Sequence, residues 1–240
     1  MAKHPLLRNA VKAFRENPMV FVAVGFCLGA FWLFSEIADD VQEGDSAEID
    51  RSLLLMLRNP ADHTDPLGAR WVEEMMRDLT ALGGATVVVF ISVATFFYLL
   101  VSRRRGHAFY LAASITTGYI FSSLSKYGFD RARPDLVPHG SYVYTSSFPS
   151  GHSLMSALAY LTLAMLLAEA HPQKGLKIFF MTVAALITMM TGFSRVYLGV
   201  HWPSDVLAGW LGGAAWALMS WLIWTRILHY HKTRKKPAAG

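Results

Sequence analysis

The chain has 240 residues, of which 53% are hydrophobic and only 16% are charged. Soluble domains carry about 25% charged residues, so this composition excludes a disordered chain and is typical of an integral membrane protein. The net charge of +5 favours anionic lipids or substrates over nucleic acid as partners, and a single cysteine, Cys27, excludes an internal disulfide framework or a multi-cysteine zinc site.

Six apolar stretches are approximately long enough to cross a bilayer as helices, which requires about 17–25 residues. They comprise residues 19–37, 85–101, 108–124, 153–167, 176–193 and 206–224. No alternating pattern indicates a β-barrel. We therefore predict an all-α bundle of six transmembrane helices, forming one membrane-embedded domain over residues 1–240.

The distribution of lysine and arginine predicts how this bundle is oriented. These residues gather in the tails 1–18 and 231–240, in the turn 103–105 and in the turn that contains Lys174 and Lys177. With six spans, all four segments lie on one side, which the positive-inside rule makes cytoplasmic. Residues 36–80, on the other side, include 12 acidic and 4 basic residues. We expect both termini to be cytoplasmic, in a bacterial cytoplasmic (inner) membrane.

The outer loop between the first two spans, residues 38–82, carries two helical patterns. Apolar residues recur at helical spacing in two sets: Ile49, Leu53, Met56 and Leu57, then Trp71, Met75, Leu79 and Leu82. Pro60 and Pro66 interrupt the region between the sets. We predict two amphipathic helices in the outer membrane interface, which either cover the bundle or form the walls of a lipid entrance.

Polar residues are costly in a membrane, so clusters of them indicate function. Three clusters follow the third span, open the fourth and link the fifth to the sixth. They contain Lys126, Asp130, Arg131, Arg133 and Pro134; Pro149, Ser150, Gly151 and His152; and Ser194, Arg195, His201 and Asp205. The predicted topology places all three on the outer face. We treat Arg131 as a candidate phosphate or headgroup contact.

The residue types in these clusters suit phosphoryl transfer. Two arginines and Lys126 supply cations, and the free N–H groups where the helix begins near Gly151 can bind an anion. Asp205 lies four residues after His201, one helical turn away, where its carboxylate can hold the imidazole N–H. Of the two histidines in these clusters, one can attack phosphorus while the other protonates the leaving oxygen.

The three clusters resemble the signatures of the type 2 phosphatidic-acid phosphatase superfamily, over residues 126–205. The resemblance implies a six-helix membrane bundle with its site at the outer leaflet. It implies that His201 is the nucleophile and forms a phosphohistidine, that His152 is the general acid and that Asp205 supports His201. It further implies phosphate binding by Lys126, Arg133, Ser150, Gly151 and Arg195, with no metal and no cofactor.

The expected activity is therefore hydrolysis of a lipid phosphate or isoprenoid diphosphate at the outer leaflet. A phosphotransferase of the same superfamily, which passes the phosphoryl group to a second lipid, is an alternative that the motifs do not separate. A non-enzymatic transporter or scaffold gives no reason for the His–Asp pair, and haloperoxidases with a similar anion cradle are soluble. Isoprenoid diphosphate, phosphatidylglycerol phosphate, phosphatidic acid and lipid A remain open as substrates, as does the oligomeric state.

Overall fold

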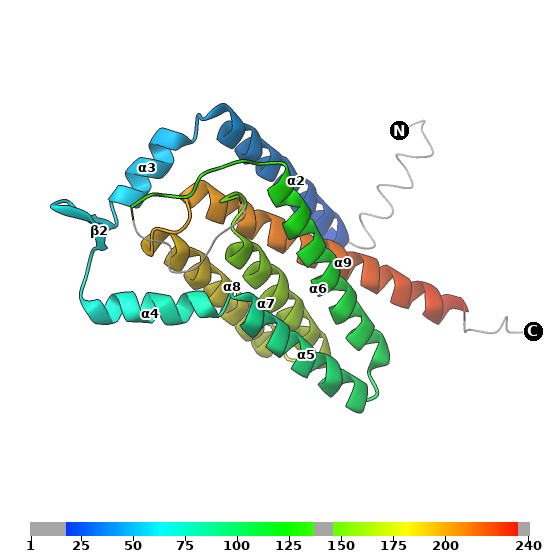
Figure 1. The fold of residues 1–240 in the computed structure, drawn as a ribbon. Helices are drawn as coiled ribbons and strands as arrows, with labels where there is room; N and C mark the ends of the chain where they lie inside the picture. Colours follow the sequence, from blue (N-terminus) through cyan, green and yellow to red (C-terminus); the bar gives the residue numbers. More distant parts are fainter. Residues whose placement is uncertain (1–17, 137–145, 235–240) are drawn as a thin grey trace, which may run out of the picture.

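The computed structural model describes residues 18–136 and 146–234 as a bundle of long helices with a smaller group of elements at one end (Figure 1). The long helices are α2 (Pro18–Glu43), α5 (Ala85–Val101), α6 (Arg105–Tyr127), α7 (Gly151–Ala170), α8 (Lys174–Tyr197) and α9 (Pro203–Arg234). Each contains one of the six apolar stretches found in the sequence. The expected tails lie largely outside the described residues.

Four of these helices are long and apolar enough to cross a membrane: α2, α7, α8 and α9. Helices α4 (Arg70–Ala81) and α5 pass the same test as a pair bent by 47°, which gives up to five spans. Helix α6 is 23 residues long but more polar, since it includes Arg105, His107 and several serines and threonines. The structure supports a membrane-embedded helical bundle, and the count of six spans stays a prediction.

Helix α7 forms the centre of the bundle and packs against both α8 and α9. Its approach to α9 is close because α9 presents glycines: a Cβ on Gly213 would lie 2.3 Å from the carbonyl oxygen of Leu154. A Cβ on Gly209 would lie 2.7 Å from the carbonyl oxygen of Ser150. The Gly-x-x-x-Gly pattern therefore serves packing inside the bundle, as small residues do in membrane helices.

The outer loop folds into helix α3 (Ala47–Leu55), a two-stranded antiparallel hairpin and helix α4. The sequence does not predict the hairpin, β1 (Arg58–Asn59) and β2 (Asp62–Pro66), because Pro60 and Pro66 indicate only a break between helices. Arg58 is buried and donates hydrogen bonds to the carbonyl oxygens of Tyr197 and Thr64. The hairpin is thereby fixed against the end of α8.

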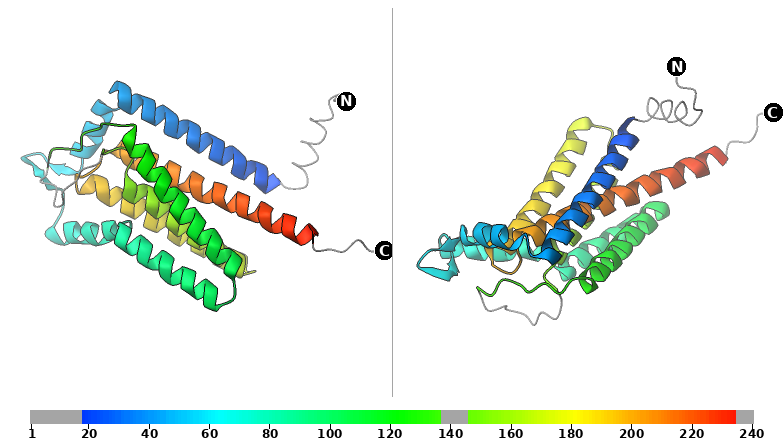
Figure 2. Two further views of the ribbon diagram at one scale, coloured as in Figure 1. Left: turned by 45° about the vertical axis from the view of Figure 1, so that its right-hand side comes forward. Right: turned by 90° about the horizontal axis from the view of Figure 1, so that it is seen from above.

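The bundle has two distinct ends (Figure 2). The α5–α6 turn, the α7–α8 turn and the last residues of α9 gather at one end, together with the start of α2. The other end carries α3, the hairpin and α4, and also the loops that precede α7 and α9. Two of the predicted basic turns thus lie at the end opposite to the three polar clusters.

Candidate functional site

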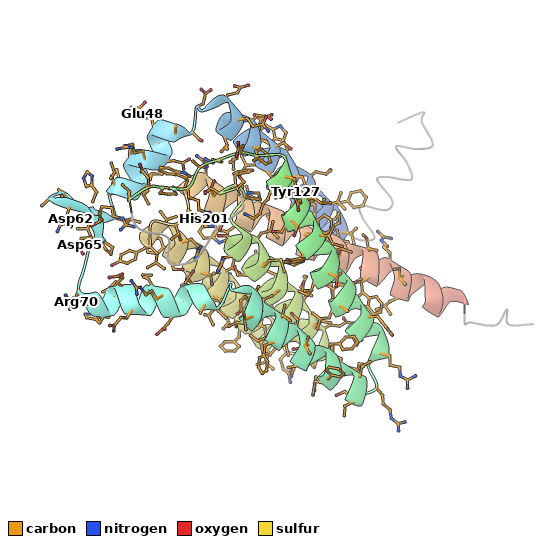
Figure 3. The ribbon with its side chains drawn as sticks, in the orientation of Figure 1. Glu48, Asp62, Asp65, Arg70, Tyr127 and His201 are labelled. Carbon is orange, nitrogen blue, oxygen red and sulfur yellow. The ribbon has the colours of Figure 1, made fainter. Side chains whose placement is uncertain are left out.

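The three polar clusters meet at this second end of the bundle. His201 lies in the turn between α8 and α9, enclosed by α3, the start of α7 and the loop after α6 (Figure 3). The backbone N–H of Ser150 donates a 2.9 Å hydrogen bond to the carbonyl oxygen of Asp205, which joins the start of α7 to the start of α9. Asp205 and Ser150 have no exposed surface, and His201 is 2% exposed.

Asp205 holds the Nδ1 side of the His201 ring. Its Oδ2 lies 3.3 Å from Nδ1 and accepts a 2.9 Å hydrogen bond from the backbone N–H of Trp202. The Ser147 hydroxyl donates to the same oxygen. Trp202 immediately precedes α9, so Asp205 reaches back to the helix start as in a capping box. An acceptor at Nδ1 places the imidazole proton there and leaves Nε2 with a free lone pair.

Nε2 of His201 faces Arg133. The guanidinium NH1 of Arg133 lies 3.0 Å from Nε2 and 3.0 Å from the carbonyl oxygen of Val200. Burial lowers the pKa of His201 to about 3, although its hydrogen bond to Asp205 and the charge of that carboxylate oppose the shift. The imidazole is therefore neutral at ordinary pH, which is the state that a nucleophile requires.

Two further cations face the same space. Lys126 donates from Nζ to the carbonyl oxygens of Ser146 and Pro149, at 3.0 and 2.9 Å, and an ammonium group has a third proton to donate. Arg195 donates to the Thr80 hydroxyl at 3.1 Å. The Nε atoms of Arg133 and Arg195 are buried and, within the described part of the chain, have no hydrogen-bond partner. Such donors can bind the oxygens of an anion.

The start of α7 borders this cationic site. Ser150 caps the helix, since its hydroxyl accepts hydrogen bonds from the N–H and the hydroxyl of Ser153, at 3.5 and 3.0 Å. At Gly151 a Cβ would lie 3.7 Å from Cε of Lys126 and 3.9 Å from Oγ of Ser122. These are ordinary contacts, so the protein itself leaves room for a side chain here. The open space beside Gly151 matches close approach of a ligand to the helix N-terminus.

His152, the second residue of α7, is half-buried on the side that faces the bend between α4 and α5. Its Nε2 lies 3.9 Å from the position that a Cβ on Gly84 would occupy. No hydrogen bond to its ring is present among the described residues. A ring without a partner from this part of the chain can bond an oxygen of a bound ligand, and a general acid needs such a position.

Three residues contact the His201–Asp205 pair or its neighbours in ways that the sequence did not predict: Ser147, Arg131 and Asp50. Ser147 has no motif around it, although its hydroxyl contacts Asp205 and also lies 3.3 Å from Nδ1 of His201. We expected Arg131 to be a phosphate or headgroup contact, but its side chain does not face the cationic site. It forms ion pairs with Asp205 and Asp50, both at 2.6 Å. Asp50 lies in α3, far from the motifs in sequence, and no local signal identified it.

Among the side chains that the structure describes, no three His, Cys, Asp or Glu residues come together in a way that could hold a metal ion. The site is built instead from nitrogen donors: Lys126, Arg133, Arg195 and the N-terminus of α7. All eight residues that the sequence indicated lie around this one end of the bundle. Their roles in binding and catalysis stay predictions.

Comparisons with known proteins agree on one family. The family whose sequence model matches the chain is the PAP2 superfamily, over residues 107–228, just over half of the chain. Phosphatidylglycerophosphatase B of Bacillus subtilis (strain 168) is 34% identical over 147 residues, which cover 58% of this chain and 68% of that protein. An undecaprenyl-diphosphatase of Sulfolobus acidocaldarius is 31% identical over 122 residues, which cover 48% of this chain and 54% of that protein.

The fold is similar as well. The crystal structure of a transmembrane PAP2-type phosphatidylglycerolphosphate phosphatase from Bacillus subtilis superimposes with a TM-score of 0.68 at 25% sequence identity. The superposition covers 88% of this chain and 98% of that one.

Proposed function

The chain belongs to the PAP2 superfamily and is a membrane phosphatase, and we propose that it hydrolyses a lipid phosphate or isoprenoid diphosphate through a phosphohistidine on His201. The observation that carries this proposal is the arrangement around one imidazole. Asp205 accepts at Nδ1, while Nε2 faces a guanidinium whose buried Nε has no hydrogen-bond partner among the described residues. An imidazole whose tautomer is fixed by a carboxylate at Nδ1, and whose Nε2 lies beside an anion site, is suited to attack on phosphorus.

The reaction proceeds in two displacements. In the first, Nε2 of His201 forms a bond to phosphorus as the bond to the lipid oxygen breaks, and His152 gives its proton to that oxygen. In the second, His152 takes a proton from water, whose oxygen bonds to phosphorus as the bond to Nε2 breaks. Inorganic phosphate leaves, and both histidines return to their starting states. Lys126, Arg133, Arg195, the Ser150 hydroxyl and the N–H groups that begin α7 at Gly151 stabilise the charge on the phosphoryl oxygens.

In this scheme Arg133 hydrogen-bonds to His201 before substrate binds and to the phosphoryl group afterwards. Without substrate its NH1 hydrogen-bonds to Nε2 of His201, which would block attack by that nitrogen. A phosphoryl group that binds between the cations offers charged acceptors to Arg133, and charge-assisted hydrogen bonds are about twice as strong as neutral ones. Substrate binding therefore releases the nucleophile.

We infer that the chain crosses the membrane six times as a single domain over residues 1–240, with the catalytic segment 126–205 facing outward. The basic turns at 103–105 and 174–177 lie at the end of the bundle opposite to His201, which supports this orientation under the positive-inside rule. Helices α3 and α4 would then lie at the outer interface. The inner membrane of a bacterium is the expected location.

The activity is tested with the purified full chain in detergent. Phosphate release is measured for phosphatidylglycerol phosphate, phosphatidic acid, undecaprenyl diphosphate and a lipid A phosphate, with EDTA present throughout. We expect turnover of at least one of these lipids, inhibition by vanadate and acid-labile, base-stable ³²P on His201. Transfer of label to added lipid without phosphate release would instead support the phosphotransferase. Absence of both products with all four lipids would overturn the proposal.

The orientation has its own test. Cys27 is replaced by alanine, and single cysteines are introduced as His63→Cys in the hairpin and Arg104→Cys in the α5–α6 turn. An impermeant thiol reagent should label position 63 in intact spheroplasts and position 104 only after lysis. The reverse pattern would place the site in the cytoplasm.

A further inference from the structure

Arg131 lies within the first polar cluster but points away from the cationic site. Its NH1 donates to Oδ1 of Asp205 at 2.6 Å and to the Ser204 hydroxyl at 2.7 Å. Its NH2 donates to Oδ2 of Asp50 at 2.6 Å and to the Ser46 hydroxyl at 3.2 Å. The guanidinium thus bridges two buried carboxylates that are 155 positions apart in the chain, and it is itself largely buried.

Asp50 also holds the start of α9 directly. Its Oδ1 accepts a 2.8 Å hydrogen bond from the backbone N–H of Ser204, and its Oδ2 accepts a 2.6 Å hydrogen bond from the Ser204 hydroxyl. Pro203, the first residue of α9, has no N–H, so Ser204 carries the first free donor of the helix. A carboxylate from α3 thereby satisfies the helix end that carries Asp205.

These contacts complete the hydrogen bonding of Asp205. Oδ2 accepts from Ser147, from the backbone of Trp202 and from Nδ1 of His201, and Oδ1 accepts from Arg131. With both oxygens occupied from fixed directions, the carboxylate cannot rotate away from the imidazole. Besides Ser147, the side chains of this network that are not defining positions of a motif are Asp50 and Arg131, and Asp50 lies outside the motif region altogether.

We propose that Asp50 and Arg131 are positioning residues for the reaction, which hold Asp205 ionised and aimed at Nδ1 of His201. This inference rests on the proposed function, because it assigns how the nucleophile of that reaction is oriented. It also assigns a purpose to α3: the outer loop supplies a residue that sets the charge beside the nucleophile.

The two positioning residues have opposite electrostatic effects. The positive charge of Arg131 partly neutralises Asp205, so Asp205 stabilises a protonated His201 less than it would alone. Asp50 partly neutralises Arg131 and so restores that support. The other charges that face His201 and Asp205 are Lys126, Arg133 and Arg195 on the substrate side, and His152 beyond them. A charge within about 4–6 Å of a group shifts its pKa by about 1–3 units. Arg131 lies 2.6 Å from the carboxylate that contacts His201, so we expect its removal to have a measurable effect on His201 through Asp205.

The experiment compares four variants of the full chain with the parent protein. Arg131→Met removes the cation, Asp50→Asn removes the distal charge but keeps its shape, and the double variant removes both. Glu48→Gln is the matched control, because Glu48 is an exposed carboxylate on the same helix (Figure 3). Each protein is assayed for kcat, KM and the pH profile of hydrolysis with the lipid phosphate that the parent turns over best. The acid limb of the profile reports the pH at which His201 becomes protonated.

We expect kcat to fall by about 10- to 100-fold in both single variants, the range found when groups that orient metal-binding histidines are removed. KM should change less than about twofold, because neither residue touches substrate. The acid limb should move to higher pH by about one unit in Arg131→Met and to lower pH in Asp50→Asn. The double variant should fall between them, and Glu48→Gln should match the parent.

A purely structural role predicts different results. If the variants lower only the melting temperature, or if both move the acid limb in the same direction, the proposal is wrong. Should Arg131→Met fail to fold, Ser204→Ala replaces it, because that change removes one hydrogen bond to each positioning residue and keeps both charges. It should lower kcat by a few-fold with no shift of the acid limb, and an unchanged kcat would overturn the proposal.

A measurement without turnover separates this inference from the proposed function. Histidine labelled with ¹⁵N reports the tautomer and the protonation of His201 in the full chain in nanodiscs. We expect a proton on Nδ1 in the parent, and protonation of His201 at a higher pH in Arg131→Met than in the parent. If the parent hydrolyses no lipid phosphate but shows these spectra, the proposed function fails and the positioning network stands. If it is active but His201 titrates identically in both proteins, only the network is refuted.

Discussion

The two ring nitrogens of His201 lie in oppositely constructed surroundings. On the Nδ1 side, both oxygens of Asp205 are occupied by protein donors, and Ser147 is fully buried against them. On the Nε2 side, Arg133 and Arg195 each keep a buried Nε without a partner among the described residues. The hydrogen bonding of the Nδ1 side is thus satisfied by the protein, whereas the Nε2 side keeps donors that a bound anion could satisfy.

This difference separates groups that set geometry from groups that bind. A buried donor without an acceptor costs about 1–3 kcal/mol, so a site that retains two of them is built for a ligand that supplies the acceptors. The saturated Asp205 shows the reverse, because added ligand would find no free position there. The side chains facing Nε2 should therefore affect substrate binding, and those facing Nδ1 should affect the chemical step.

The largest effect is expected at the imidazole that joins the two sides. His201→Ala should abolish turnover, by at least about 10⁴-fold, and should remove the covalent phosphoenzyme. Asp205→Asn should lose about 10²–10⁴-fold, since the amide disturbs the tautomer but leaves the nucleophile in place. Rapid-quench trapping with ³²P-labelled substrate measures both steps. Label that persists in His201→Ala and disappears in His152→Ala would show that the roles of the two histidines are reversed.

The proposed acid role of His152, on the Nε2 side of His201, can be tested with two leaving groups of different basicity. His152→Ala should slow hydrolysis of a lipid phosphate by about 10²–10⁴-fold, because the departing alkoxide then receives no proton. An activated aryl phosphate has a leaving group that scarcely needs one, so its hydrolysis should suffer much less. The ratio of the two rate losses is the measurement. Equal losses with both substrates would show that His152 binds the phosphoryl group and does not protonate the leaving group.

Gly151 and Gly209 allow a test that separates ligand binding from helix packing. At Gly151 a Cβ meets only ordinary contacts with Lys126 and Ser122, so Gly151→Ala should leave the melting temperature unchanged. It should lower kcat/KM by about 10²-fold, because a small displacement of the phosphoryl group is costly. Gly209→Ala places a Cβ 2.7 Å from a carbonyl oxygen and should destabilise the fold by about 1–3 kcal/mol. The melting temperature and kcat/KM of both variants are measured. If Gly151→Ala lowers the melting temperature, Gly151 serves helix packing and the prediction is wrong.

The sequence was sufficient to locate the helices but not their ends. The predicted stretch 85–101 matches α5 at both ends, because charged and glycine residues flank it closely. Helix α9 begins three residues before its apolar stretch, since Pro203 and Asp205 stabilise a helix start that hydropathy cannot detect. The hairpin between α3 and α4 depends on Arg58 and the distant Tyr197, so no local pattern predicted it.

The site was predictable where its chemistry is local in sequence. His201 and Asp205 are one helical turn apart, and their contact follows from that spacing alone. The contact between Arg131 and Asp50 spans 81 positions and depends on how α3 packs on α9, which no spacing rule provides. From the sequence, Arg131 was only a candidate phosphate or headgroup contact, whereas the structure pairs it with Asp50 and Asp205. The candidate phosphate-binding side chains were visible in the motifs, whereas the contacts of Asp50 and Arg131 behind the His201 ring required the fold.

The smallest expected effect concerns stability, and it tests whether burial keeps His201 neutral in the fold. Burial lowers the pKa of His201 to about 3, against about 6.5 in an unfolded chain. Between these values the unfolded state binds a proton that the folded state excludes, so lowering the pH destabilises the fold, by at most about 1.4 kcal/mol per pH unit. The melting temperature should therefore fall more steeply between pH 7 and pH 5 in the parent than in His201→Gln. The other titrating groups are common to both proteins and cancel in this comparison. If the melting temperature depends on pH equally in both proteins, His201 takes up a proton in the folded state as readily as in the unfolded chain. The proposal that His201 is neutral in the fold would then be wrong.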